Sequence, residues 1–107
     1  MSEEINTLYE RTKVVLNDIL TLKNEIVELE RNPSLEKLHF TLGHANQIFD
    51  ILAIIRTDYD LFLEKMITSE QIILLNSNKR YYNSVIDRFG LYKKRLLILS
   101  SKLRGEL

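Results

Sequence analysis

The sequence predicts an all-α protein that folds as an antiparallel up-down-up bundle of three long helices. The chain of 107 residues holds only three Gly and one Pro, which is too few turn-forming residues for a sheet protein. Apolar residues also recur at alternating spacings of three and four, the heptad pattern of helices that pack along one another. A length of this order fits a single domain, over residues 1–107.

The first predicted helix covers residues 3–31. Ser2 can cap its first amides, and Glu3 and Glu4 complement the positive end of the helix dipole. Pro33 ends the helix, because proline cannot continue it. One polar residue, Thr12, interrupts an otherwise apolar seam. The seam consists of Ile5, Leu8, Thr12, Val15, Ile19, Leu22, Ile26 and Leu29.

The second predicted helix covers residues 33–66, with Asn32 as its N-cap and Pro33 at its first position. Following the apolar residues along this helix requires one shortened step near Leu52. The resulting seam is Leu35, Leu38, Leu42, Ala45, Phe49 and Leu52, then Ile55, Tyr59, Phe62 and Met66. Because of this shortened step, a break of the helix within residues 57–60 is an alternative.

The third predicted helix covers residues 69–104. Thr68 and Gln71 have the spacing of a capping box, in which each residue satisfies a backbone amide of the other. The seam consists of Leu75, Asn78, Tyr82, Val85, Phe89, Tyr92, Leu96, Leu99 and Leu103. The short connections favour the up-down-up arrangement. A four-helix bundle, split near Thr57 and Ser77, is the alternative.

Charge is divided unevenly between the two parts of the chain. Residues 1–70 hold thirteen acidic and seven basic residues, whereas residues 71–107 hold two acidic and eight basic ones. The bases could pair internally with Glu25, Glu28 and Glu30, or bind an anionic partner such as a lipid headgroup, RNA or an acidic helix. The candidates for a basic surface are Arg88, Lys93, Lys94, Arg95, Lys102 and Arg104.

The middle of the second helix is apolar on all sides, because Asp50 alone interrupts residues 48–55. Helices of this kind lie inside larger assemblies. The surplus residues either widen the core or form a face that binds another helical protein, including a second copy of the chain. The candidates for partner binding are Ile48, Ile51, Ile54 and Ile55.

The sequence contains no motif for catalysis, a metal or a cofactor. It has no Cys, and His39 and His44 are five residues apart, whereas a helical metal pair needs a spacing of three or four. Its three glycines are isolated, so no phosphate-binding loop exists, and Gly90 is expected to admit a close neighbour instead. Nucleic-acid binding is disfavoured by the zero net charge.

The location expected from these features is the cytosol. The longest apolar runs have five residues or fewer, far below the roughly 20 residues that cross a bilayer. The N-terminus is acidic and lacks the apolar stretch of a signal peptide. The absence of Cys fits a reducing compartment.

Three short stretches resemble the N-terminal Habc-type domain of a Qb-SNARE, and of membrin-like Golgi SNAREs in particular. They are Leu8, Tyr9 and Thr12; Gln47, Ile48 and Phe49; and Asn78, Lys79 and Arg80. The resemblance implies a regulatory or recruiting domain of a longer protein, on the cytosolic face of the endoplasmic reticulum or Golgi. Its partner would be a SNARE helix or a tether.

We therefore expect a non-enzymatic protein-protein interaction module without a cofactor. The alternative is a structural helical subunit of a larger assembly, such as a kinetochore, tethering or phage complex. In that case the surplus apolar residues would be permanent interfaces.

Overall fold

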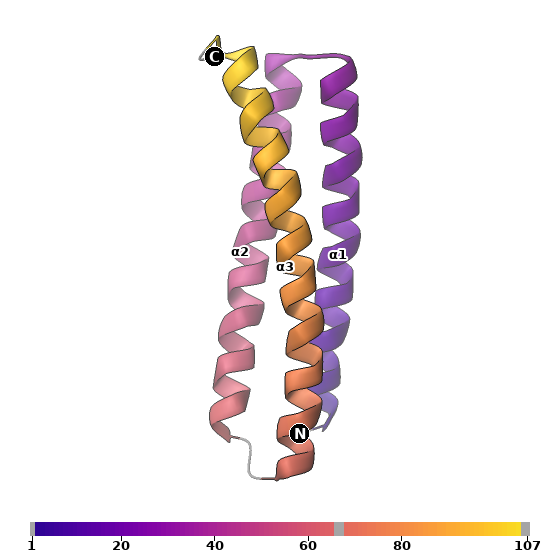
Figure 1. Cartoon of the computed structure of the whole chain (residues 1–107), viewed down its shortest axis with the longest axis vertical. Helices are drawn as coiled ribbons and strands as arrows, with labels where there is room; N and C mark the ends of the chain where they lie inside the picture. Colours follow the sequence, from indigo (N-terminus) through magenta and orange to yellow (C-terminus); the bar gives the residue numbers. More distant parts are fainter. Residues whose placement is uncertain (1, 66–67, 106–107) are drawn as a thin grey trace.

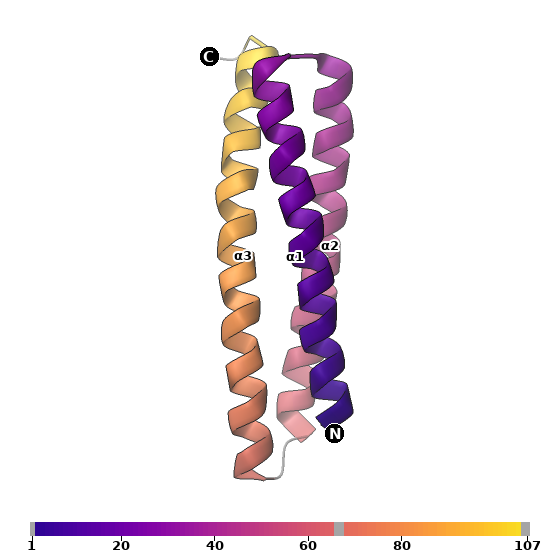
Figure 2. The ribbon, with the colours of Figure 1, turned by 90° about the vertical axis from the view of Figure 1, so that its right-hand side faces the viewer.

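The protein is a rod of three helices in the computed structural model, which describes residues 2–65 and 68–105 (Figure 1). The helices are α1 (Ser2–Arg31), α2 (Leu35–Lys65) and α3 (Ser69–Leu103), and the described residues include no strand. α1 and α3 run in one direction and α2 in the other, and every pair of helices is in contact. The rod measures 54 × 21 × 16 Å (Figure 2). The all-α, three-helix fold expected from the sequence is confirmed.

The core of α1 is the heptad seam read from its sequence. All eight seam residues, from Ile5 to Leu29, are buried, including the polar Thr12. Thr12 can be buried because its hydroxyl donates a hydrogen bond to the carbonyl oxygen of Leu8, 2.8 Å away. A hydroxyl that bonds within its own helix leaves no unsatisfied donor in the core.

The seam predicted for α2 is confirmed at Leu38, Ala45 and Leu52 and wrong at Leu35, Leu42 and Phe49. The buried residues form an unbroken heptad series without a phase slip: Leu38, Thr41, Ala45, Ile48, Leu52, Ile55 and Tyr59. Thr41 replaces the expected Leu42, because its hydroxyl donates to the carbonyl oxygen of Lys37 at 2.8 Å. Leu35 and Phe49 are consequently exposed, and Leu42 and Phe62 are half-buried. Met66 lies outside the described residues.

The start of α2 also differs from the prediction. Ser34 caps the helix, since the backbone amide of Lys37 donates to the Ser34 hydroxyl at 3.3 Å. Pro33 therefore precedes the cap instead of occupying the first helical position. Asn32 completes α1, because its backbone amide donates to the Glu28 carbonyl oxygen at 2.9 Å and its side chain bonds the Glu28 carboxylate. The predicted end at residue 66 lies outside the described part of the chain.

The predicted capping box of α3 is confirmed. The Gln71 amide donates to the Thr68 hydroxyl at 3.2 Å, and the Thr68 amide donates to the Gln71 side chain at 3.3 Å. α3 ends at Leu103, one residue before the expected end, and Gly105 then adopts φ +72°. This left-handed conformation suits glycine and stops the helix. α2 and α3 are continuous through Thr57 and Ser77, so the four-helix alternative is wrong.

The three helix pairs are not equally close. α1 contacts both other helices extensively, whereas α2 and α3 contact each other much less. α2 and α3 are therefore the least closely packed pair of helices, and the candidate site lies between them.

Candidate protein-binding groove

A groove of about 470 Å³ runs along the surface between α2 and α3, and we refer to it as the α2/α3 groove. Its floor consists of buried Leu52, Tyr82 and Phe89. Phe49 forms part of its rim and is 53% exposed. The remaining apolar or small lining residues are Ala53, Ile86 and Gly90. Aromatic and aliphatic side chains thus reach solvent together in one concave place.

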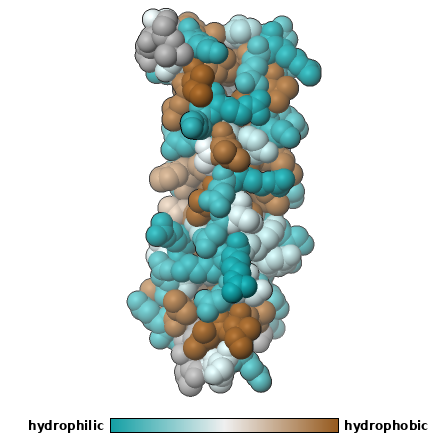
Figure 3. Space-filling view, in the orientation of Figure 1, coloured by the Kyte–Doolittle hydropathy of each residue, from teal (hydrophilic) through white to brown (hydrophobic). Residues whose placement is uncertain are grey.

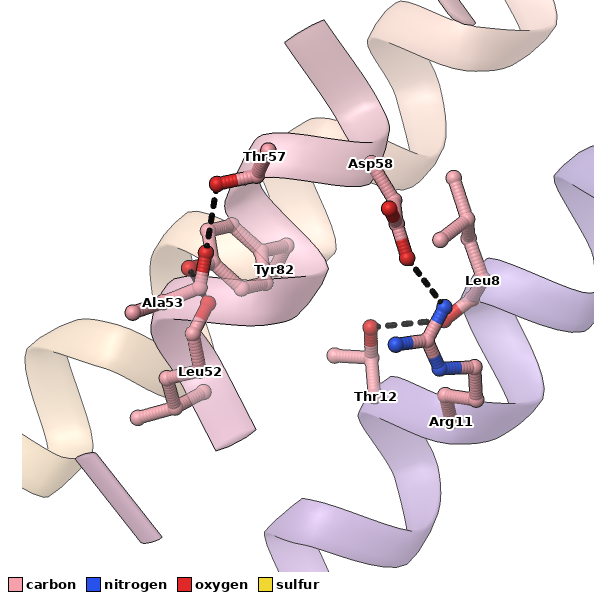
Figure 4. A network of polar contacts seen from close by, with 8 residues as sticks. All are labelled: Leu8, Arg11, Thr12, Leu52, Ala53, Thr57, Asp58 and Tyr82. Atoms are coloured by element: carbon pink, nitrogen blue, oxygen red, sulfur yellow. Dashed lines mark hydrogen bonds and ion pairs between the residues drawn. The ribbon is translucent and has the colours of Figure 1, made fainter. Parts of the chain in front are cut away.

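Two tyrosines hold the floor of the groove in place. The Tyr82 hydroxyl, on α3, donates to the carbonyl oxygen of Leu52 on α2 at 2.5 Å (Figure 4). Tyr59, on α2, donates in the opposite direction to the carbonyl oxygen of Asn78 at 3.3 Å. The two rings are tilted against each other with their centroids 5.4 Å apart, within the favourable range for aromatic pairs. These contacts fix α2 against α3 beneath the open rim.

Neither Tyr82 nor Tyr59 is charged at neutral pH. Burial raises the pKa of Tyr82 to about 12, although the positive charge of Arg56 acts in the opposite direction. Burial also raises the pKa of Tyr59, against a lowering by its hydrogen bond with Thr12. The charge of the groove therefore comes from its rim alone.

The rim of the α2/α3 groove is basic. Arg56 of α2 and Lys93 of α3 line it, and no carboxylate is among the described residues that do so. The Lys93 ammonium lies 4.9 Å from the centre of the Phe49 ring, a cation-π geometry that places positive charge directly over the apolar rim. The groove is thus apolar inside and positive at its edges.

The four isoleucines predicted to bind a partner do not share a surface. Ile48 and Ile55 are 1% and 0% exposed, so their assignment to a binding face is wrong. They belong to the core because the heptad series of α2 continues through both of them. Ile51 and Ile54 are exposed, but Ile51 lines a hollow against Val14 of α1, away from α3.

Sequence reasoning missed the residues that do form the groove. The sequence predicts Phe49 in the core and a close neighbour at Gly90. A Cβ atom built on Gly90 would meet nothing within 4 Å, so the glycine leaves space in the groove. The residue that could have revealed the rim is Thr41. If Thr41 is placed in the seam, the next seam positions are Ala45 and Ile48, and Phe49 then faces solvent. Thr12 already showed that threonine fits such a seam.

Five of the six candidate basic residues lie on α3 and Arg104 directly follows it, and their surroundings differ. The Arg95 guanidinium contacts the Glu30 carboxylate of α1 at 2.5 Å, and Lys93 lies over Phe49 as described. The other four are exposed and make no ion pair within residues 2–65 and 68–105. They are Arg88, Lys94, Lys102 and Arg104.

Internal pairing accounts for only part of the charge asymmetry. Of the three acidic residues expected to face α3, only Glu30 does so, through Arg95. Glu25 instead contacts His44 of α2, with 2.5 Å between the ring Nδ1 and a carboxylate oxygen. Glu28 accepts a hydrogen bond from Asn32. Most cations of α3 are therefore left to face solvent.

No candidate metal centre or membrane-spanning helix is present in the described part of the chain. No three or more His, Cys, Asp or Glu side chains there come together as possible ligands. Among the same residues, no helix is long and apolar enough to cross a bilayer.

Comparisons of the chain with protein-family models, curated proteins and solved structures found no match. The geometry and charge of the surface are therefore the basis for inferring function.

Proposed function

We propose that the protein is a non-enzymatic interaction module whose α2/α3 groove binds an amphipathic helix with acidic flanks. The observation that carries this proposal is the groove itself. It exposes an apolar interior, while Arg56 and Lys93 are the charged residues that line it. Concave apolar surface that remains exposed is typical of places where another protein binds.

A helix is the occupant that suits the shape of the site. The groove lies along two antiparallel helices, and a third apolar stripe placed there would turn the three-helix rod into a four-helix arrangement. Residues at i, i+3, i+4 and i+7 of the incoming helix could contact Phe49, Ile86 and the space at Gly90.

The charges at the rim favour acidic residues beside that apolar stripe. Glu or Asp on the incoming helix would meet Arg56 and Lys93, whereas Lys or Arg would meet like charge. Such pairs at the edge of an interface chiefly set specificity and association rate. Acidic flanks therefore define the class of helix that this groove selects.

The resemblance to a Qb-SNARE suggests a specific partner and a specific process for this proposed module. If the protein is the N-terminal regulatory domain of a membrin-like SNARE, the occupant is a SNARE helix or a segment of a tether. The protein would then act in vesicle transport on the cytosolic face of the endoplasmic reticulum or Golgi. Support for this form comes from the three short sequence stretches, two of which, at residues 47–49 and 78–80, lie beside or include groove residues.

A second candidate function is that of a structural subunit in a larger helical assembly. The observation that favours it is the distribution of exposed aliphatic residues over all three helices, including Val14, Ile54 and Leu97. Light scattering at micromolar concentration separates the two functions. A stable monomer favours the interaction module, and an obligate oligomer favours the structural subunit.

Selection from a helical peptide library tests the groove directly. The library fixes Leu and Ile at the seam positions and randomises the flanking positions among Glu, Gln and Lys. The purified protein should enrich peptides with Glu at the flanks. Phe49→Glu and Lys93→Glu should each abolish binding of the selected peptides, because they place a negative charge in or beside the groove.

The matched control is Val14→Glu, which introduces the same charge at an exposed apolar residue next to α2 but outside the groove. It should leave binding unchanged. The proposal is wrong if the selected peptides carry Lys at their flanks. It is also wrong if Val14→Glu weakens binding as much as Phe49→Glu does.

A further inference from the structure

The outward surface of α3 presents aliphatic side chains to solvent along one line of the helix. Leu91 is 65% exposed and Ile98 is 47% exposed. They are seven residues apart, close to two helical turns, so they lie on the same side of α3. Ile73, also exposed, lies roughly five turns before Leu91 on the same line.

Cations flank this line on both sides. Lys94 follows Leu91 by three residues and Lys102 follows Ile98 by four, so each lies one turn away on nearly the same side. Arg88 precedes Leu91 by three residues. All three are exposed and make no ion pair with any other described residue. Asp87, exposed and four residues before Leu91, is the one carboxylate on this side of α3, and residues 88–105 contain no acidic residue.

We propose that this outer surface of α3, centred on Leu91 and Ile98, binds an anionic lipid surface. A helix that lies in the plane of a membrane places aliphatic side chains between the headgroups and extends flanking Lys and Arg side chains to the phosphates. The surface of α3 has both features, since its aliphatic residues are at the centre and its cations at the sides.

The distribution of charge over the rod suits a one-sided contact. The carboxylates of the chain lie mainly on α1 and α2, and Asp87 is the only one between residues 71 and 105. Figure 3 views the rod with α3 nearest, and apolar areas there alternate with hydrophilic ones along the whole length. A flat negative surface could approach α3 while the acidic helices point away from it.

The lipid-binding surface and the α2/α3 groove are separate. Consecutive helical residues turn by about 100°, so Leu91 and Ile98 lie on a different side of α3 from Gly90 and Lys93, and Lys94, one turn after Gly90, lies between the two surfaces. The groove would consequently stay open beside the membrane. Lipid binding does not depend on whether the groove has an occupant.

Vesicle co-sedimentation of the full chain tests the proposal. One set of vesicles contains equal amounts of phosphatidylcholine and phosphatidylserine, and the other contains phosphatidylcholine alone. The protein should bind the first set and not the second, and binding should weaken as salt increases, because salt screens the attraction. Equal binding to both sets, or binding to neither, overturns the proposal.

Substitutions at the surface distinguish lipid insertion from attraction of charge alone. Lys94→Gln and Lys102→Gln should each weaken binding about fivefold, the effect of one cation near an anionic membrane. Leu91→Ser should weaken it by about tenfold or more, because a buried leucine is lost. All three residues are exposed, and unchanged circular-dichroism melting should show that the fold is intact.

Matched controls are Lys37→Gln and Val14→Ser, which remove an exposed cation and an exposed aliphatic residue from α2 and α1. Neither should change vesicle binding by more than about twofold. Single-stranded polyuridine provides the remaining comparison. If it binds more tightly than the vesicles and Leu91→Ser has no effect on either, the surface binds anions without inserting and the lipid proposal is wrong.

Discussion

The hollows on the two sides of α2 differ in charge. On the α1 side, five acidic and two basic side chains line the hollows: Glu10, Asp18, Glu25, Glu28 and Glu36, with Arg11 and Lys37. Contacts between Arg11 and Asp58 and between Glu25 and His44 bridge the two helices there. On the α3 side, the groove has a basic rim and no acidic lining residue in the described part of the chain.

This difference shows how one helix can present two distinct surfaces. A heptad seam fixes only which residues are buried, and the flanking positions on either side of the seam are free to differ. In α2 one flank pairs with α1, whereas the other carries Phe49 and Arg56 to solvent. The two sides thus differ in the sign of their charge: a hollow of about 620 Å³ with three carboxylates and one lysine lies on the α1 side, whereas the α2/α3 groove has a basic rim.

The largest expected effect is the difference in stability between a variant in the floor of the α2/α3 groove and a variant at its rim. Phe89→Ala should lower the free energy of unfolding by about 3 to 5 kcal/mol, because it removes a buried ring. Phe49→Ala should lower it by less than about 1 kcal/mol, since that ring is exposed. Urea unfolding of both variants measures the difference. Equal losses would mean that Phe49 belongs to the core after all.

The next effect concerns the bond that ties the two sides of the groove floor. Tyr82→Phe should lower the free energy of unfolding by about 1 kcal/mol, because the hydrogen bond to the Leu52 carbonyl oxygen is lost while the ring remains. Urea unfolding again measures the change. The control is Thr7→Val, which removes an exposed hydroxyl that donates a hydrogen bond to the Glu3 carbonyl oxygen within α1. A change no larger than that of the control would show that the bond does not stabilise the floor.

The same tyrosine predicts a dependence on alkaline pH. Its pKa is raised from 10.0 to about 12 on folding, so the folded protein keeps the proton at pH values where the unfolded chain loses it. The resulting stability is complete below pH 10 and is lost as the pH rises from 10 toward 12. Melting temperatures of the wild type should therefore fall more steeply over this range than those of Tyr82→Phe. Parallel curves would contradict the raised pKa.

The smallest effect concerns the ion pair between Arg11 of α1 and Asp58 of α2. Arg11→Gln should lower the free energy of unfolding by about 0.2 to 1 kcal/mol, because its contact with Asp58 is partly exposed. Arg56→Gln should have less effect, since Arg56 makes no ion pair with the residues that the structure describes. Unfolding in low salt and in about 1 M salt checks the assignment, because screening should remove the difference.

The sequence predicts the buried residues of α1 well and those of α2 less well, and a buried threonine is the residue that matters in both helices. In both helices a threonine occupies a buried heptad position and bonds to a carbonyl oxygen four residues before it. In α1 the apolar residues around Thr12 leave no competing choice. In α2 the adjacent Leu42 offers an apolar alternative to Thr41, and the predicted seam accordingly contains Leu42 and Phe49 in place of Thr41 and Ile48.

The groove could not be read from the sequence, because exposure depends on which flank a neighbouring helix covers. Leu16 of α1 and Phe49 of α2 occupy equivalent places beside their seams, yet Leu16 is half-buried and packs on the core. The capping box of α3, in contrast, depends only on Thr68 and Gln71 and was predicted correctly. Local hydrogen bonding is therefore readable from the chain, and the relative spacing of helices is not.

An odd number of antiparallel helices has a mechanical consequence. The chain enters the rod at Ser2 and leaves it near Gly105 at the opposite pole, along a long axis of 54 Å (Figure 1). A bundle with an even number of helices would return the chain to its starting pole. Two tags fused to the two ends of the rod would accordingly be held apart by about its length.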